Sequence, residues 1–513
     1  MTPMPTPHVP LNADPASDDG RYLALRARDA RFDGQFFTGV TSTGIYCRPV
    51  CAVRTPRREN CLFFTLAAQA ESAGFRPCLR CRPEVAPHAL AWSVQDASSI
   101  LVQQAVRLLD APDAWDGGQG VSAADLARRL GVSDRHLRRI FEAALGVSPL
   151  QYLQTRRLLT AKQLLTDTRM PITQVALASG FGSVRRFNAA FAGHYGLNPT
   201  QLRRADAAPG GGTGGSLRLA YRPPFDVAAL LTFFAQRQFE GVEWAQPGEA
   251  MVLRRTVRLR AGGQETTGWL SARFDTARHW VLLETSDSLH PVLPQVIARV
   301  RAMLDLDADP AAINAVLHSA FPEGDGLRVP GAFDGFELAV RAVLGQQITV
   351  AAARTLGQRL VERFGDPITT PWPELRSLFP SPAVLARAEG DALGQLGIVR
   401  QRQAAIVALA RAVDSGQLAL HPGADVAATT AALCGLPGIG DWTAQYIALR
   451  ALRWPDAFPA GDVALHKALG VQGQKNPARA ATAVADAWRP WRGYAVLRAW
   501  AAGSISTPSL LKA

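Results

Sequence analysis

Two kinds of hydrophobic spacing divide the chain into helical and extended segments. Apolar residues recur at helical intervals over residues 95–205, and Ala- and Leu-rich helical segments broken by Gly and Pro dominate from about residue 305 onward. Between them, residues 252–260 end in strict alternation of apolar and basic positions, and residues 279–284 form a second apolar run. The pattern therefore predicts a mainly helical chain with strands in its middle.

Composition divides this pattern into domains. A chain of 513 residues is long enough for several hydrophobic cores. Its start is rich in Pro, Asp and small residues, which predicts disorder, and a later run of Gly predicts a flexible linker that tethers two halves loosely. We expect a disordered tail at residues 1–20, a cysteine-containing domain at 21–90 and a helical domain with an internal repeat at 95–205. The linker follows at 206–216, then an α+β subdomain at 217–305 and a final helical domain at 306–505.

Charge and cysteine content narrow the class of protein. The net charge of +12 favours a polyanionic partner such as nucleic acid, although an Arg- and Ala-rich genome would give the same excess. Six cysteines are too few for a disulfide scaffold in a chain of this length. No basic segment precedes a continuous apolar run, and no apolar stretch reaches the roughly 18 residues of a membrane span. We therefore expect a soluble cytoplasmic protein.

Four cysteines lie in two close pairs, Cys47 with Cys51 and Cys78 with Cys81. Two such pairs separated by a few dozen residues match the ligand spacing of one tetrahedral zinc site. The neighbouring residues are basic, which favours the thiolate, the form that binds metal and attacks carbon. Spacing alone favours a purely structural zinc site over a reactive one. Cys61 lies in an apolar segment and is expected in the core.

An internal repeat occupies residues 120–205. The Gly-Val-Ser-Pro motif at 146–149 recurs as Gly-Leu-Asn-Pro at 196–199. Each copy predicts a helix, a Gly turn and a second helix, with Ser122 and Ser133 as helix caps in the first copy. This is the spacing of a helix-turn-helix, whose second helix enters the DNA major groove; two ordinary surface helices are the alternative. The basic residues of the second helices are Arg135, Arg138, Arg139, Arg185 and Arg186.

The cysteine segment closely resembles the N-terminal domain of the Ada family, at residues 33–37, 43–51 and 74–81, and residues 95–204 resemble the DNA-binding domain of AraC-type regulators. In the Ada family the first cysteine accepts a methyl group from a methylphosphotriester in DNA, and the match assigns this role to Cys47. The resemblance implies one Zn²⁺ held by the four cysteines and a stoichiometric reaction. Methylation would remove negative charge, raise DNA affinity and switch on a transcription activator that contacts RNA polymerase.

A glycine-rich joint near the C-terminus predicts a helix-hairpin-helix. Gly438 and Gly440 let the hairpin backbone approach a DNA phosphate, Leu436 begins the same segment, and the next helix offers free N–H groups. The hairpin alone is a moderate signal because Gly-rich helix joints are common. A downstream aspartate, Asp462, flanked by Gly and Pro, makes the pattern more specific.

Hairpin and aspartate together resemble the helix-hairpin-helix superfamily of DNA glycosylases, and residues 217–503 resemble its AlkA branch. The resemblance implies an enzyme that flips an alkylated base such as 3-methyladenine out of the duplex and cleaves its N-glycosidic bond. It makes Asp462 the catalytic carboxylate, which stabilises positive charge on the sugar; a plain helix cap is the alternative. Members that nick the strand carry a Lys where this chain has Trp442, so we expect a monofunctional enzyme.

The resemblance also assigns a base pocket and a wedge. Trp442, Tyr446 and Trp500 match pocket-lining aromatic residues, and the first two lie one helical turn apart. Electron-rich rings attract a cationic alkylated purine by about 0.5–2 kcal/mol, although an ordinary apolar helix face would look the same. Gln347 stands where the family has an aliphatic residue that fills the gap left by the flipped base, so its contribution as a wedge stays open.

These expectations combine into a multidomain, mainly α protein with α+β parts: a small zinc-binding α/β domain, an AraC-type double helix-turn-helix, an antiparallel-sheet α+β subdomain and an all-α helix-hairpin-helix glycosylase domain. We expect DNA alkylation repair coupled to regulation of the adaptive response in a bacterial, nucleoid-associated protein. Its partner is double-stranded DNA, both alkylated DNA and a promoter operator, and paired helix-turn-helix units suit a monomer. The alternative is a methylation sensor whose glycosylase-like half only binds DNA.

Overall fold

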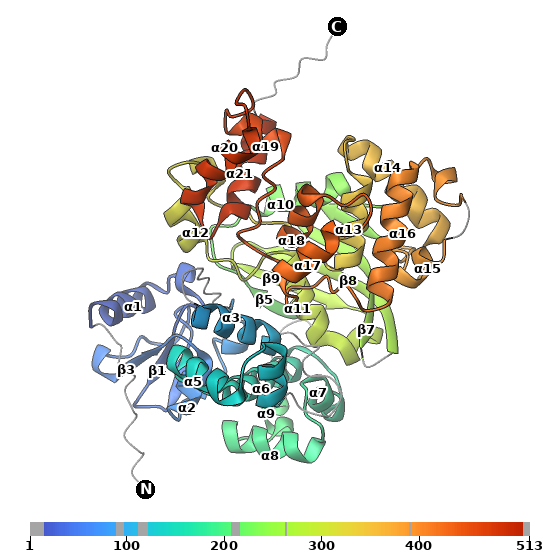
Figure 1. Ribbon diagram of the computed structural model, residues 1–513. Coiled ribbons are helices and arrows are strands. Elements are labelled where there is room, and N and C mark those ends of the chain that lie inside the picture. The colour runs from blue at the N-terminus through green and yellow to red at the C-terminus, as the bar shows by residue number, and fades with distance from the viewer. Residues whose placement is uncertain are drawn as a thin grey trace.

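The computed structural model describes residues 15–88, 97–110, 122–206, 216–261, 264–388 and 391–505. Helices predominate, and the sheets in these ranges have four and five strands (Figure 1). The predicted fold class, mainly α with α+β parts, is confirmed. In the described ranges no helix is both long and apolar enough to cross a membrane. The central part of the expected linker, residues 207–215, lies outside the described residues.

The first sheet organises the cysteine-containing region. Its strand order is β3 (Cys61–Phe64), β1 (Phe37–Val40), β2 (Ile45–Cys47) and β4 (Arg76–Pro77), with β4 parallel to β2 and the other pairs antiparallel. The short helix α2 (Ala67–Ser72) follows β3. Cys61 is buried, as predicted.

A helix precedes this sheet where disorder was expected. Helix α1 (Pro15–Ala27) begins inside the tail predicted at 1–20, so residues 15–20 are helical, and residues 1–14 lie outside the described residues. The composition of the tail gave the wrong prediction because α1 has an apolar side. Ala24 and Leu25 pack into a buried cluster with Phe36 and Phe63, and this packing stabilises the helix.

Two helix-turn-helix units follow, which confirms the predicted repeat. The first is α4 (Ala123–Arg129) with α5 (Asp134–Leu145), and the second is α7 (Ile172–Ala178) with α8 (Val184–Tyr195). Ser122 and Ser133 cap their helices as predicted. The remaining helices of this region precede, join and follow the two units; they are α3 (Ala97–Asp110), α6 (Pro149–Asp167) and α9 (Pro199–Asp206).

The second sheet is antiparallel throughout, in the order β5-β9-β8-β7-β6. Both predicted strands lie within it. Its strands are β5 (Leu217–Ala220), β6 (Glu243–Gln246), β7 (Val252–Ala261), β8 (Gln264–Asp275) and β9 (Trp280–Thr285). The accompanying helices are α10 (Val227–Arg237) and α11 (Leu293–Met303).

One hydrophobic core runs across the boundary between the two halves of the chain. Phe187 and Phe191 of α8 belong to the same buried cluster as Leu217 of β5, Leu283 of β9 and Val296 of α11. Loose tethering through the Gly-rich segment was therefore the wrong expectation. The domains on either side of this segment bury apolar surface against each other, which a prediction from its composition could not include.

The C-terminal region is a bundle of helices with two cores. Its helices are α12 (Pro310–Leu317), α13 (Gly335–Leu344), α14 (Val350–Phe364), α15 (Pro382–Ala386), α16 (Arg400–Asp414), α17 (Val426–Cys434), α18 (Asp441–Arg450), α19 (Val463–Ala468), α20 (Pro477–Ala485) and α21 (Arg492–Ile505). Helix α18 joins the cores, because Ile447 packs into one and Leu449 into the other. Tyr446 borders the first core and Trp500 the second, so the seam between them carries the predicted pocket residues.

Candidate functional sites

The helix-hairpin-helix connects α17 to α18 and leaves the start of α18 open. Gly438 has φ of +74°, a conformation that favours glycine, and a Cβ there would lie 3.2 Å from Gln401 O. Gly440 is exposed and caps α18 without a side-chain hydrogen bond. The first N–H groups of α18 can therefore receive a phosphate. Leu436 is half-buried and packs on the adjacent core, which anchors the hairpin.

Asp462 is held by donors from three helices. Its Oδ2 accepts a 2.7 Å hydrogen bond from Trp442 Nε1, and its Oδ1 accepts from Trp500 Nε1 at 3.1 Å and from the backbone of Leu465 at 2.6 Å. The last bond makes Asp462 the N-cap of α19. The cap and the functional interpretation are therefore compatible, because the same carboxylate also faces a cavity.

This cavity has a volume of about 470 Å³ and brings together Asp462 with Trp442, Tyr446 and Trp500. The rings of Trp442 and Tyr446 are stacked, with centroids 5.3 Å apart and planes 10° apart, and Trp500 lies 6.3 Å from Tyr446. The predicted pocket residues therefore share one site, and an incoming base would meet aromatic ring faces beside a carboxylate. Their roles in a reaction stay predictions.

A buried arginine fixes the orientation of Tyr446. Arg450 Nη1 donates a 2.6 Å hydrogen bond to the Tyr446 hydroxyl, while Arg450 Nε donates to the carbonyl of Pro330, also at 2.6 Å. Arg237 lines the cavity as well, 3.8 Å from the ring centre of Phe233. The sequence interpretation missed both arginines, although Arg450, four residues after Tyr446 on one helix, was a usable signal.

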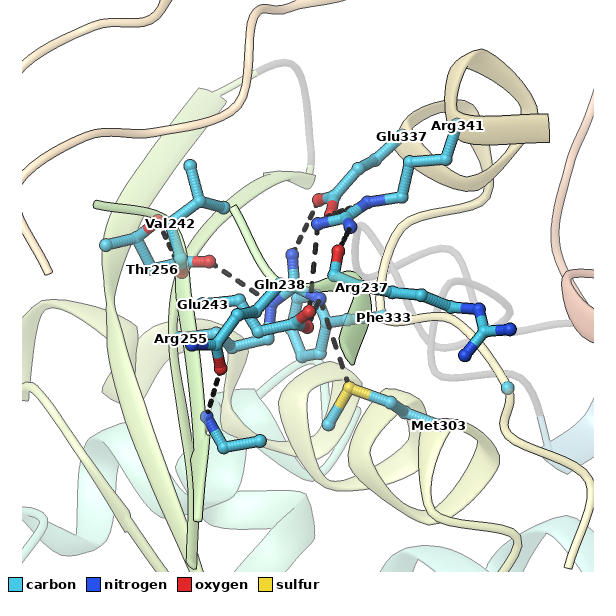
Figure 2. A network of polar contacts seen from close by, with 12 residues as sticks. Arg237, Gln238, Val242, Glu243, Arg255, Thr256, Met303, Phe333, Glu337 and Arg341 are labelled. Atoms are coloured by element: carbon cyan, nitrogen blue, oxygen red, sulfur yellow. Dashed lines mark hydrogen bonds and ion pairs between the residues drawn. The ribbon is translucent and has the colours of Figure 1, made fainter. Parts of the chain in front are cut away.

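Two buried carboxylates and two arginines also line the cavity. Figure 2 shows the polar network that Glu243, Glu337, Arg255 and Arg341 form. Glu337 accepts from Arg255 at 2.6 Å and from Arg341 at 2.9 Å, while Glu243 lies 3.3 Å from Arg255. Burial alone would raise the pKa of Glu337, but Arg255 and Arg341 outweigh it and lower this pKa. For Glu243 burial prevails and the pKa is raised. The sequence interpretation missed this network. Glu337 and Arg341, which lie four residues apart in the otherwise apolar helix α13, were a usable signal for a buried ion pair.

The predicted wedge residue is exposed on a loop that is tied to the hairpin. Gln347 lies between α13 and α14 with φ of +54°. Its neighbour Gln346 donates through Nε2 to Gly438 O at 2.9 Å and to Thr443 Oγ1 at 3.0 Å. Arg402 donates to the backbone carbonyl of Gln346. Gln346, which the sequence interpretation did not single out, thus links the loop to the start of α18.

The four predicted metal ligands form one cluster. The parallel pairing of β2 with β4 brings Cys47 and Cys51 close to Cys78 and Cys81, and all four sulfurs lie within 4.8 Å of one another. Zn–S bonds of about 2.3 Å in a tetrahedron require sulfurs about 3.8 Å apart. The donor set and its spacing therefore fit a zinc ion.

The side chain next to the first cysteine is buried. The guanidinium of Arg48 forms an ion pair with Asp33, and its Nη1 donates to Cys81 O at 2.9 Å. The backbone N–H of Arg48 points at Cys81 Sγ, 3.3 Å away. Through these contacts with Asp33 and Cys81, Arg48 holds the segment after Cys47 in place beside the cluster.

The predicted DNA-contacting arginines lie on the second helix of each helix-turn-helix unit. On α5, Arg138 lies 3.5 Å from Asp134 and Arg139 lies 3.2 Å from His136. All five side chains are exposed, so they are available to a DNA groove: Arg135, Arg138, Arg139, Arg185 and Arg186.

Comparison with known proteins agrees with this arrangement. Four families match: the metal-binding domain of Ada at residues 20–84, a helix-turn-helix domain at 126–205, the AlkA N-terminal domain at 216–334, and the HhH-GPD superfamily of base excision DNA repair proteins at 340–492. These matches and the cysteine cluster together identify an Ada-type zinc site.

Three relatives cover the chain in complementary ways. A probable bifunctional transcriptional activator/DNA repair enzyme AlkA of Mycobacterium tuberculosis is 38% identical over 93% of this chain and 95% of its own length. The DNA-3-methyladenine glycosylase 2 of Escherichia coli is 34% identical over 55% of this chain and 95% of its own length. The bifunctional transcriptional activator/DNA repair enzyme Ada of Escherichia coli is 35% identical over 32% of this chain and 43% of its own length.

Proposed function

Because the chain belongs to the family of bifunctional transcriptional activator/DNA repair enzymes AlkA, we propose that its two halves perform two separate reactions on alkylated DNA. The C-terminal half is a DNA glycosylase of the helix-hairpin-helix type. We infer that it is monofunctional and that it excises alkylated bases such as 3-methyladenine. The observation that carries this inference is the carboxylate of Asp462, which faces an aromatic cavity and accepts hydrogen bonds from two of its indoles.

In the proposed reaction the bond between the sugar C1′ and the base nitrogen breaks, and its electron pair leaves with the base. Positive charge develops on the sugar, and the carboxylate of Asp462 stabilises it. Water then adds to C1′ and releases a proton to the solvent. Trp442 and Tyr446 attract a cationic alkylated base through their ring faces. Because an indole stands at position 442 and no amine, a Schiff base with the sugar does not form there.

The DNA backbone would bind at the hairpin. Gly438, Gly440 and the open N-terminus of α18 suit a phosphate. Leu436 anchors this segment because it packs against the adjacent hydrophobic core. Gln347 would enter the space left by the flipped nucleotide, and its amide can hydrogen-bond the base that stays behind.

For the N-terminal half we propose that Cys47 accepts a methyl group from a methylphosphotriester. Its thiolate attacks the methyl carbon, an S–C bond forms, the C–O bond breaks, and the electron pair leaves on the phosphate oxygen as its restored negative charge. Zinc, when bound by Cys47, Cys51, Cys78 and Cys81, keeps the thiolates ionised. The protein is consumed, so each molecule reacts once.

Methylation would then act as an electrostatic switch. Conversion of Cys47 to a thioether removes one negative charge near DNA, and phosphate contacts dominate DNA affinity. The methylated protein would bind its operator through the exposed arginines of α5 and α8. We propose that it does so as a monomer in the bacterial cytoplasm and that it recruits RNA polymerase there.

A two-substrate assay tests this function. The full-length zinc-loaded protein is incubated with a duplex that carries alkylated purines and with one that carries a labelled methylphosphotriester. We expect free 3-methyladenine, strand breaks only after alkali treatment, and at most one labelled methyl group per protein. Methyl transfer without any released base would support the alternative, a sensor whose glycosylase half only binds DNA.

A further inference from the structure

Arg222, in the segment between β5 and α10, is fully buried at the junction of the two halves of the chain. Its guanidinium donates five hydrogen bonds to backbone carbonyls, at 2.7–3.4 Å, which matches the five N–H groups of an arginine side chain. The acceptors come from both halves: Asp33, Pro87 and His88 in the zinc-binding half, Asp307 and Ala308 in the glycosylase half.

The first of these acceptors connects the junction to the cysteine cluster. While the backbone carbonyl of Asp33 accepts from Arg222 at 2.7 Å, its side-chain carboxylate forms the buried ion pair with Arg48. Arg48 directly follows Cys47 in the chain, and its backbone N–H points at Cys81 Sγ. Two buried residues therefore separate an arginine of the glycosylase half from the reacting sulfur.

The loop that contains Asp33 has little room to move against the glycosylase half. Gly34 has φ of +73°, and a Cβ there would lie 3.3 Å from Nη2 of Arg222, across the junction, and 1.9 Å from Pro87 O of its own half. Gln35 donates through Nε2 to Asp309 Oδ2 at 3.0 Å. Close packing and these hydrogen bonds hold the loop against residues of the other half, so loss of Arg222 would release it.

We propose that Arg222 is a positioning residue for the methyl-acceptor site, supplied to the zinc-binding half by the glycosylase half. This rests on the proposed role of Cys47. Through Asp33, Arg222 fixes Arg48 and with it the direction in which Cys47 faces the methyl carbon. Attack on carbon needs in-line geometry, and a displacement of about 1 Å in such a site costs about 100-fold in rate. In this fused chain the glycosylase half is therefore part of the sensor.

The test compares Arg222→Met and Arg222→Lys with the wild type and with Arg273→Ala, an exposed arginine of β8. Single-turnover methyl transfer is measured at several DNA concentrations, together with base release and backbone hydrogen exchange of residues 33–36. For Arg222→Met we expect a maximal transfer rate at least tenfold lower, unchanged half-saturating DNA, faster exchange at 33–36 and base release within twofold of wild type. Arg222→Lys should transfer methyl faster than Arg222→Met but more slowly than the wild type. The control Arg273→Ala should keep the wild-type rate.

Methyl transfer at the wild-type rate in Arg222→Met would overturn the proposal, and so would a loss confined to DNA affinity. If Arg222→Met does not fold, Gln35→Ala removes the hydrogen bond to Asp309 that holds the same loop against the glycosylase half, and it should slow transfer two- to fivefold. An unchanged rate again overturns the proposal. A failure of the underlying function looks different, because the wild-type protein itself would then accept no methyl group.

Discussion

The indole of Trp442 donates a 2.7 Å hydrogen bond to Oδ2 of Asp462, across 20 residues of chain and between two different helices. Trp500 donates to the other oxygen from a third helix. Two indole N–H groups thus fix the orientation of this carboxylate, which lines the cavity. This relationship ties the hairpin, whose second helix carries Trp442, to the proposed catalytic group.

Replacing Trp442 by Phe removes this hydrogen bond and keeps an aromatic ring over Tyr446. A hydrogen bond to a charged group contributes about 1.5–3 kcal/mol, so we expect single-turnover release of 3-methyladenine to slow by about 10- to 100-fold, with little change in DNA affinity. Trp372→Phe, which alters an indole outside the cavity lining, is the matched control. Release at the wild-type rate by Trp442→Phe would contradict the assigned role of this bond.

Replacing Gln346 by Ala cuts the tie between the wedge loop and the hairpin. We expect weaker base flipping, measured as a smaller fluorescence rise of a 2-aminopurine placed beside the lesion, and base release about tenfold slower, because the loop loses its bonds to Gly438 and Thr443. Gln417→Ala, at an exposed position after α16, serves as control. Normal flipping by Gln346→Ala would show that the loop positions itself without this tie.

Replacing Glu337 by Ala leaves Arg255 and Arg341 buried with an incomplete set of partners. Breaking a buried ion pair costs about 3–5 kcal/mol, which urea unfolding at neutral pH should reveal. Since the folded pKa of Glu337 lies below its unfolded value, its stabilising contribution is complete above about pH 4.3 and is lost as the pH falls through the folded pKa. The difference between variant and wild type should therefore shrink in acid. Glu362→Ala, at an exposed position, should change the unfolding free energy by no more than about 0.5 kcal/mol.

Replacing Cys47 by Ala should abolish labelled methyl transfer and leave base release within twofold of wild type, because the two proposed reaction centres lie in different halves. Cys434→Ala, at an exposed cysteine outside the cluster, should transfer methyl normally. Transfer that persists in Cys47→Ala would move the acceptor to another residue. Chelation of zinc from the wild-type protein should likewise stop transfer, since the thiolates lose the cation that holds them.

Local sequence patterns predicted much of this molecule. The helix caps Ser122 and Ser133, the paired cysteines and the shared helix face of Trp442 and Tyr446 follow from spacings within a few residues, which secondary structure converts directly into geometry. The assignment of Trp442 and Tyr446 to a base pocket came from the family resemblance. Trp500 was assigned through a family resemblance, since no local spacing relates it to the hairpin.

What sequence could not predict depends on contacts between distant segments. The five carbonyl acceptors of Arg222 come from three separate stretches of chain, and no pattern near Arg222 in the sequence predicts them. The Gly-rich segment suggested independent halves, yet Phe187 and Leu283 share one core across it. The composition of this segment carried no information about the interface between the domains on either side of it.

The most direct test of the account is single-turnover release of 3-methyladenine by Asp462→Asn, an isosteric change that keeps the α19 cap and removes the negative charge. We expect a rate lower by about 100- to 1,000-fold or more, with DNA binding and methyl transfer to Cys47 preserved. Release at the wild-type rate would contradict the claim that this carboxylate carries base excision.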